Sequence, residues 1–177
     1  MFIKPQHENP KPKQKPEKQL DPTLLSRDYL LENGKMTILP VDYVIEHGKN
    51  FDDEDINRDN IWGDYKCYPD GRHFSGLLYE LYINDTLAYY SFHENGIENG
   101  ITICFYPSGE IKSYRVYNKG RPVRESYEWY ETGEIKVYNC CYRRGYCMKC
   151  TEYDRAGNIT KCIDRTKKAS AQLYMGE

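Results

Sequence analysis

Apolar and polar residues alternate along the chain from about residue 75 to residue 163, which is the pattern of β-strands with one buried face. We expect the buried face to carry Leu77, Tyr79, Leu81, Ile101, Ile103, Phe105, Tyr127 and Trp129. The opposite face then carries Glu80, Tyr82, Tyr106, Glu128, Tyr130 and Glu152. In the strands between them, one recurring column holds Leu87, Ile111, Ile135 and Ile159, and a second holds Tyr90, Tyr114 and Tyr138. The pattern therefore predicts a mainly β protein.

The alternation recurs with a period of 24 residues. Residues 105–128 align with residues 129–152, so that the Gly-Glu-Ile-Lys run at 109–112 falls on the same run at 133–136. Residues 81–104 precede them in the same register. Each unit has the pattern of two antiparallel strands joined by tight turns, in which glycine supplies a positive φ. One hairpin is only marginally stable in water, so we expect the units to stack into an array.

These units resemble the MORN repeat, in the shorter-signature variant common in bacteria. The matching stretches are GRHFSGLLYELY (71–82), ENGIENGITICFYPSGEIKSYRVYNKG (94–120) and EWYETGEIKVY (128–138). The resemblance implies an elongated, twisted, single-layer antiparallel sheet of successive hairpins over residues 68–163. The turn at 143–145 is shifted by one residue and the turn at 153–157 is one residue longer. Both departures predict a degenerate C-terminal cap.

The N-terminal third lacks the repeat. Residues 1–20 are rich in Lys and Pro and should form a disordered tail. Residues 21–67 form a predicted capping segment, with a helix over 22–32 that begins at Asp21 and stops at Asn33-Gly34. One or two short strands, interrupted by Pro40, should follow, and then an acidic loop. Residues 164–177 are predicted to be a C-terminal tail.

Composition limits the possible partners and compartments. The net charge of −2 and the sequence pI of about 6.1 favour neither direct nucleic-acid binding nor an acidic membrane. No window approaches the ~18 apolar residues of a membrane span, and residues 1–20 do not resemble a secretory signal. The seven cysteines are an odd number, which favours reduced thiols and a cytoplasmic location.

Residues that could carry chemistry are scattered. The four histidines and the serines match no catalytic motif, so we expect no catalytic residue, no enzyme activity and no cofactor. Cysteines cluster near the C-terminus, where Cys147-x-x-Cys150 is half of a zinc pattern. On a strand these two thiols point to opposite faces, so no metal site is predicted. The thiols could instead form a regulatory disulfide or stay unpaired.

Bacterial single-domain proteins with this repeat are similar to antitoxin or immunity proteins, which neutralise a polymorphic toxin by binding it. The resemblance therefore implies a cognate toxin domain as partner, whose active site or substrate surface is covered. The residues predicted to contact it are Tyr82, Tyr90, Tyr106, Tyr114, Tyr130, Tyr138, Glu80, Glu128, Asp52, Asp53, Glu54 and Asp55.

A simpler interpretation stays open for each group of residues. The tyrosine ladder can be cross-strand packing alone, and the acidic run can be a solvated loop. The alternative function is a non-enzymatic scaffold that binds a protein or a membrane surface. The open edges of the sheet could pair between chains, so the sequence predicts neither a monomer nor a dimer.

Overall fold

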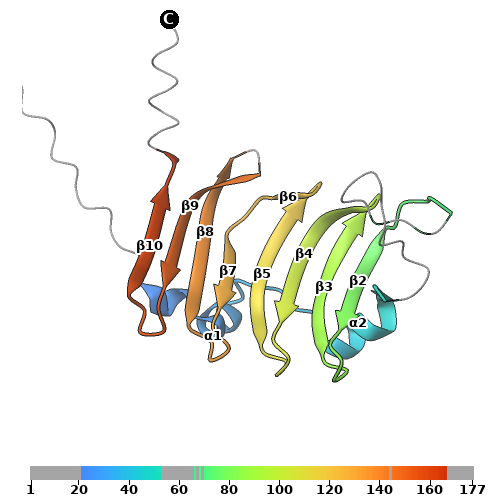
Figure 1. Cartoon of the computed structure of the whole chain (residues 1–177), viewed down its shortest axis with the longest axis horizontal. Coiled ribbons are helices and arrows are strands. Elements are labelled where there is room, and N and C mark those ends of the chain that lie inside the picture. Colours follow the sequence, from blue (N-terminus) through green and yellow to red (C-terminus); the bar gives the residue numbers. More distant parts are fainter. Residues whose placement is uncertain (1–20, 53–65, 67, 69, 144, 167–177) are drawn as a thin grey trace, which may run out of the picture.

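The strands of the molecule lie side by side in one open sheet, as the computed structural model shows (Figure 1). The structure describes residues 21–52, 66, 68, 70–143 and 145–166, with side chains omitted at 141–143. The helical elements are η1 (Pro22–Leu25), α1 (Arg27–Glu32) and α2 (Val41–His47). The strands are β1 (Lys49–Asn50), β2 (Gly76–Leu81), β3 (Leu87–Glu94), β4 (Ile97–Phe105), β5 (Ile111–Asn118), β6 (Arg121–Pro122), β7 (Ser126–Trp129), β8 (Ile135–Arg143), β9 (Tyr146–Tyr153) and β10 (Ile159–Asp164).

The ten strands follow one another across the sheet in nearly the order of the chain. From β2 to β10 all described pairings are antiparallel, and only β1 pairs parallel, with β2. The short strand β6 pairs with β5 and lies off the main path. The predicted mainly β fold with a single open sheet is confirmed, while the 24-residue period stays a prediction.

Tight turns of one kind close the hairpins at one end of the sheet. The N–H of Gly109 donates to the carbonyl of Tyr106 (2.8 Å), and Gly133 bonds to Tyr130 in the same way (2.9 Å). These glycines adopt φ values of +87° and +102°. Such angles are strained for a residue with a Cβ, so glycine is the natural residue here. A register shift follows each turn where the next strand begins.

The predicted first helix is broken into two. Asp21 caps η1 as expected, because its carboxylate accepts from the Thr23 N–H at 2.9 Å. Ser26 then adopts an extended ψ of 148°, and its hydroxyl accepts from the Tyr29 N–H to cap α1. Because Ser26 forms this cap, one continuous helix over 22–32 is wrong. The predicted stop is confirmed, with Gly34 at φ +62° after α1.

The strands predicted after residue 35 are wrong for most of that stretch. Residues 41–47 form the helix α2, and only Lys49–Asn50 forms a strand there. The β-branched residues favoured a strand locally, but packing decides between the two structures. Pro40 is the N-cap of α2. Val44 is fully buried and belongs to the main core cluster, together with Leu77 and Tyr79.

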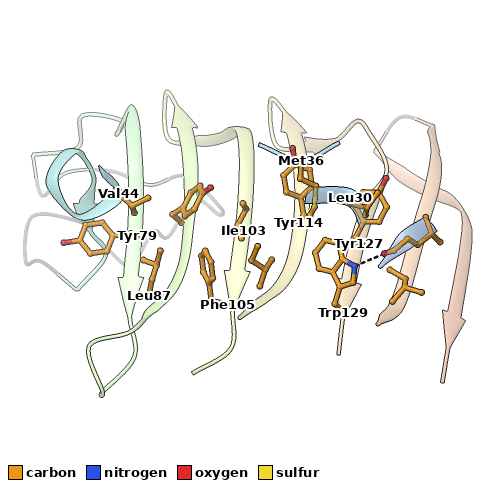
Figure 2. Close-up of a cluster of buried hydrophobic side chains, with 14 of the residues drawn as sticks. Leu30, Met36, Val44, Tyr79, Leu87, Ile103, Phe105, Tyr114, Tyr127 and Trp129 are labelled. Carbon is orange, nitrogen blue, oxygen red and sulfur yellow. Dashed lines mark hydrogen bonds between the residues drawn. The ribbon is translucent and has the colours of Figure 1, made fainter. Parts of the chain in front are cut away.

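The main core lies between one face of the sheet and the N-terminal segment 21–48 (Figure 2). One row of directly paired residues crosses this face: Tyr79, Tyr90, Ile103, Tyr114, Tyr127, Tyr138, Thr151 and Cys162. We call it the inner row. The N-terminal segment buries Leu25, Leu30, Met36 and Val44 against this face.

Polar contacts fix the N-terminal segment on the sheet. The indole Nε1–H of Trp129 donates to the Leu25 carbonyl at 2.9 Å, and the Leu39 N–H donates to the Tyr90 hydroxyl at 3.0 Å. Arg27 is 9% exposed, and its Nη1 lies 2.7 Å from the Glu110 carboxylate. The segment therefore lies across the inner row, with hydrogen bonds to Tyr90 on β3 and to Trp129 on β7.

A second, smaller core lies on the opposite face at the β2 end. It contains Phe74 and Leu78, with Phe51 and Tyr68 packed around them. His93 lies beside Phe74 and is 7% exposed; its Nε2 is 2.9 Å from the Ser91 hydroxyl. Burial lowers the pKa of His93 to about 4. The imidazole is therefore neutral in the folded protein near pH 7.

We expect His93 to make the protein less stable in acid. Its pKa is about 4 when folded and near 6.5 when unfolded. Between these values the unfolded chain binds a proton that the native imidazole does not, so stability is full above pH ~6.5 and falls towards pH ~4. The loss approaches about 3 kcal/mol.

Urea unfolding of the wild type and of His93→Gln between pH 4 and pH 7 measures this loss. Carboxylates titrate in both proteins, so the difference between the two isolates His93. The stability of the variant should approach that of the wild type as the pH falls. A gap independent of pH would contradict the prediction, and His47→Gln, on a half-exposed side chain, serves as the control.

Candidate protein-binding face

The face of the sheet opposite the inner row is polar. One row of directly paired residues crosses it from β2 to β10: Glu80, Tyr89, Cys104, Ser113, Glu128, Val137, Glu152 and Lys161. We call this the outer row and its side of the sheet the outer face. Most of the row is half-buried. The faces predicted from the alternation are confirmed for Glu80, Glu128 and Glu152, which all lie in this row.

Three tyrosines of the outer face tie each hairpin to the next. The hydroxyl of Tyr82 donates to the Phe105 carbonyl at 2.8 Å, that of Tyr106 to the Trp129 carbonyl at 2.7 Å, and that of Tyr130 to the Tyr153 carbonyl at 2.9 Å. All three side chains are half-buried. Their hydroxyls therefore serve the fold, and part of each residue remains accessible.

Replacing Tyr106 by Phe should lower the free energy of unfolding by about 1 kcal/mol, the typical contribution of one hydrogen bond. The ring and its packing are kept, so only the bond to the Trp129 carbonyl is lost. Urea unfolding followed by circular dichroism measures the change. Tyr146→Phe is the matched control, because Tyr146 is 76% exposed. Equal midpoints for the two variants would contradict a structural role for the hydroxyl.

The other three predicted tyrosines belong to the inner row. Tyr90 is 0% exposed and Tyr114 is 7% exposed, and both lie in the core beneath the N-terminal segment. Tyr138 is half-buried and donates to the Glu125 carboxylate at 2.7 Å. An exposed ladder including Tyr90 and Tyr114 is therefore wrong, and cross-strand packing describes these two residues. The six tyrosines do not form one surface, and their contact with a partner stays a prediction.

Two carboxylates of the outer row form ion pairs. Glu128 accepts from Lys136 at 2.7 Å, and this bond raises the pKa of the lysine. Glu152 accepts from Lys161 at the same distance. Both pairs are partly exposed, so solvent screens their attraction and they contribute little to stability. Their main effect is to order charged groups on the outer face.

The predicted acidic loop is only partly covered by the structure. Asp52 is exposed and lies in the turn after β1. Asp53, Glu54 and Asp55 lie outside the described residues, as does the predicted N-terminal tail. Whether this loop adds to the outer face stays a prediction.

A basic spot near the middle of the outer face escaped the sequence interpretation. A shallow depression of about 260 Å³ is lined by Thr102, Cys104, Lys112, Ser113, Arg115 and Glu128. Lys112 and Arg115 are exposed, and the Lys112 ammonium lies 5.7 Å from the centre of the Tyr106 ring. Cys104 stands in the register that Glu80, Glu128 and Glu152 occupy at steps of 24 residues. The absence of a carboxylate at position 104 was the signal in the sequence that could have indicated this basic spot.

A second surface that the sequence did not reveal lies on α2. Val41, Tyr43 and Ile45 are exposed by 46%, 45% and 44%, and Tyr43 stacks on His47. Val41 and Ile45 lie one turn apart on the same side of the helix, and exposed apolar residues gathered in this way can mark a protein contact. It lies on the N-terminal segment and not on the outer face.

The predicted cysteine chemistry gains no site from the geometry. Cys104, Cys150 and Cys162 are free thiols. Burial raises the pKa of Cys150, which disfavours its thiolate. In the described part of the chain, no three His, Cys, Asp or Glu side chains come together to hold a metal ion. The same residues include no helix of sufficient length and apolarity to span a membrane.

Comparison with known proteins adds no relative from which a role could be transferred. No protein-family model matches the chain, and no curated protein matches it.

Proposed function

We propose that this protein is a cytoplasmic immunity protein that binds a cognate toxin domain through its outer face. The observation that carries the proposal is the repeated tyrosine bond, which ties each hairpin to its neighbour. Such ties favour a surface that is ordered before it binds, and little entropy is then lost on association. The resemblance of the units to repeats of immunity proteins supports the choice of partner.

The charge pattern of the outer face supports a specific protein contact. Acidic and basic groups alternate along it, with the pairs Glu128–Lys136 and Glu152–Lys161 on one side of Lys112. Alternating charges select a partner with the complementary order and speed its approach. The accessible parts of Tyr106 and Tyr130 lie at the same end of the strands and would supply aromatic contact area.

The test begins with recovery of the tagged protein from its native cells. A supporting result is one stoichiometric partner that arrests growth when expressed alone and is harmless together with this protein. Lys112→Glu with Arg115→Glu should then weaken binding by about 100-fold and abolish protection. The matched control is Lys35→Glu with Arg124→Glu, which adds the same charges on the other side of the sheet. Loss of protection in the control alone would contradict the outer face as the site.

The apolar surface of α2 favours a second candidate, a scaffold that holds a non-toxic protein. Val41 and Ile45, one turn apart on the helix, supply its contact area. If the recovered partner is harmless alone, and if Val41→Ser with Ile45→Ser releases it while the Lys112 and Arg115 variant does not, the scaffold replaces the immunity proposal.

A further inference from the structure

The sheet is interrupted between β5 and β7. Strand β4 is continuous over Ile97–Phe105, but the corresponding stretch 24 residues later is divided into β6 and β7. In β4, Gly100 adopts φ +128°, and a Cβ there would lie 2.9 Å from the Cβ of Phe92. Arg124 stands 24 residues after Gly100, and Pro122 has no N–H to give to the ladder. These residues cannot reproduce the close packing of β4. The Val123 N–H still donates to the Val116 carbonyl at 3.0 Å, and the chain leaves the ladder after it, at 124–125.

The interruption opens a pocket on the inner side of the sheet. The pocket has a volume of about 350 Å³ and is lined by Lys35, Tyr114, Val116, Arg124, Glu125 and Tyr127. Tyr114 and Tyr127 are directly paired in the inner row and are 7% and 8% exposed. They form an aromatic floor that the core holds in place, and Figure 2 shows Tyr114 beside Met36 of the N-terminal segment.

One wall of the pocket is a fixed carboxylate. Glu125 accepts from the Tyr127 hydroxyl and from the Tyr138 hydroxyl, both at 2.7 Å. Burial, and then the bond to Glu125, raises the pKa of both phenols, so they remain donors at neutral pH. The Glu125 carboxylate is thereby held in place by hydrogen bonds from two hydroxyls.

Two cations complete the pocket. Lys35 comes from the N-terminal segment and Arg124 from the interruption, and both side chains are exposed. Within the described residues neither forms an ion pair. Two cations and one carboxylate therefore surround the aromatic floor, and the carboxylate already accepts hydrogen bonds from two hydroxyls. The pocket keeps an excess of positive charge for a ligand.

We propose that this pocket binds a small ligand with an aromatic or apolar body and an anionic head group, either a carboxylate or a phosphate. The body packs on Tyr114 and Tyr127, where aromatic stacking is favourable. The head group lies between Lys35 and Arg124, whose guanidinium matches both anions through paired N–H donors. The site lies across the sheet from the outer face and is independent of the proposed function.

Titration of the ¹⁵N-labelled full-length protein, followed by amide chemical shifts, tests the site with three probes. Phenyl phosphate and benzoate carry the two possible head groups, and benzylamine has a similar body with the opposite charge. Saturable shifts near Lys35, Arg124 and Glu125 with an anion, and none with benzylamine, support the proposal. Saturation by only one of the anions identifies the head group.

Variants on both walls keep the test independent of any one substitution. Arg124→Gln and Lys35→Gln should each lower the affinity for the anion by about tenfold, the effect of one charge-assisted hydrogen bond. Arg115→Gln removes a cation from the outer face, across the sheet from the pocket, and should leave the affinity for the anion unchanged. Absence of saturable shifts, equal binding of benzylamine, or unchanged affinity in both pocket variants would overturn the proposal.

Discussion

Trp129→Ala is expected to lose about 4 kcal/mol of the free energy of unfolding, as buried Trp-to-Ala replacements typically do. The side chain is 0% exposed and stacks on Tyr127 with ring centres 5.6 Å apart. Its indole also donates to the Leu25 carbonyl at 2.9 Å. The replacement therefore opens a cavity in the core and releases η1 from the sheet.

Urea unfolding followed by far-ultraviolet circular dichroism measures this loss. Trp129→Phe keeps most of the packing but leaves the buried Leu25 carbonyl unpaired, and it should lose about 2 kcal/mol. Tyr146→Ala is the control and should remain within about 0.5 kcal/mol of the wild type, since its side chain is largely exposed. A Trp129→Ala protein that unfolds at the wild-type midpoint would show that the N-terminal segment does not depend on this anchor.

The strand faces could be predicted because alternation is a local property. Successive strand residues point to opposite sides, so Ile103 and Phe105 had to share a face whatever lay above them. The turns at Gly109 and Gly133 could be predicted for a similar reason, since a tight turn needs a positive φ.

The cover of the sheet could not be predicted, because it depends on contacts distant in the chain. Val44 packs into the core of the sheet as part of a helix, although its neighbours favour a strand. Ser26 divides the first helix because its hydroxyl caps the second part. In both cases the local preference was weak, and tertiary packing or capping decided the outcome.

The candidate site was predicted only in part for the same reason. Both faces of the sheet carry tyrosines at regular intervals, and alternation alone does not say which face is covered. The N-terminal segment covers Tyr90 and Tyr114 and leaves Tyr106 and Tyr130 on the outer face. Side-chain pairs such as Glu128–Lys136 require the strand register, which the sequence shows only through the alignment of its units.

Gly100→Ala is the second large loss that we expect, about 3 kcal/mol. Gly100 has φ +128°, outside the left-handed region that Asp85, Asn95 and Lys119 occupy between +49° and +61°. Residues with a Cβ pay about 1–3 kcal/mol in such a conformation. The new Cβ would also lie 2.9 Å from the Cβ of Phe92, which belongs to the backbone-proximal part of its side chain and cannot rotate away. Strain and overlap therefore add.

Gly109→Ala separates these two causes. Gly109 also has a positive φ, of +87°, but a Cβ there would meet nothing within 4 Å. It should lose only about 1 kcal/mol, the cost of the conformation alone. Urea midpoints of the two variants, compared at equal m-values, measure the difference. Equal losses would mean that the contact with Phe92 relaxes freely, and the division of the later strand at Arg124 would then need another cause. A clearly larger loss for Gly100→Ala would show that the contact with Phe92 adds to the strain of the conformation, and it would support Arg124 as a cause of the break between β6 and β7.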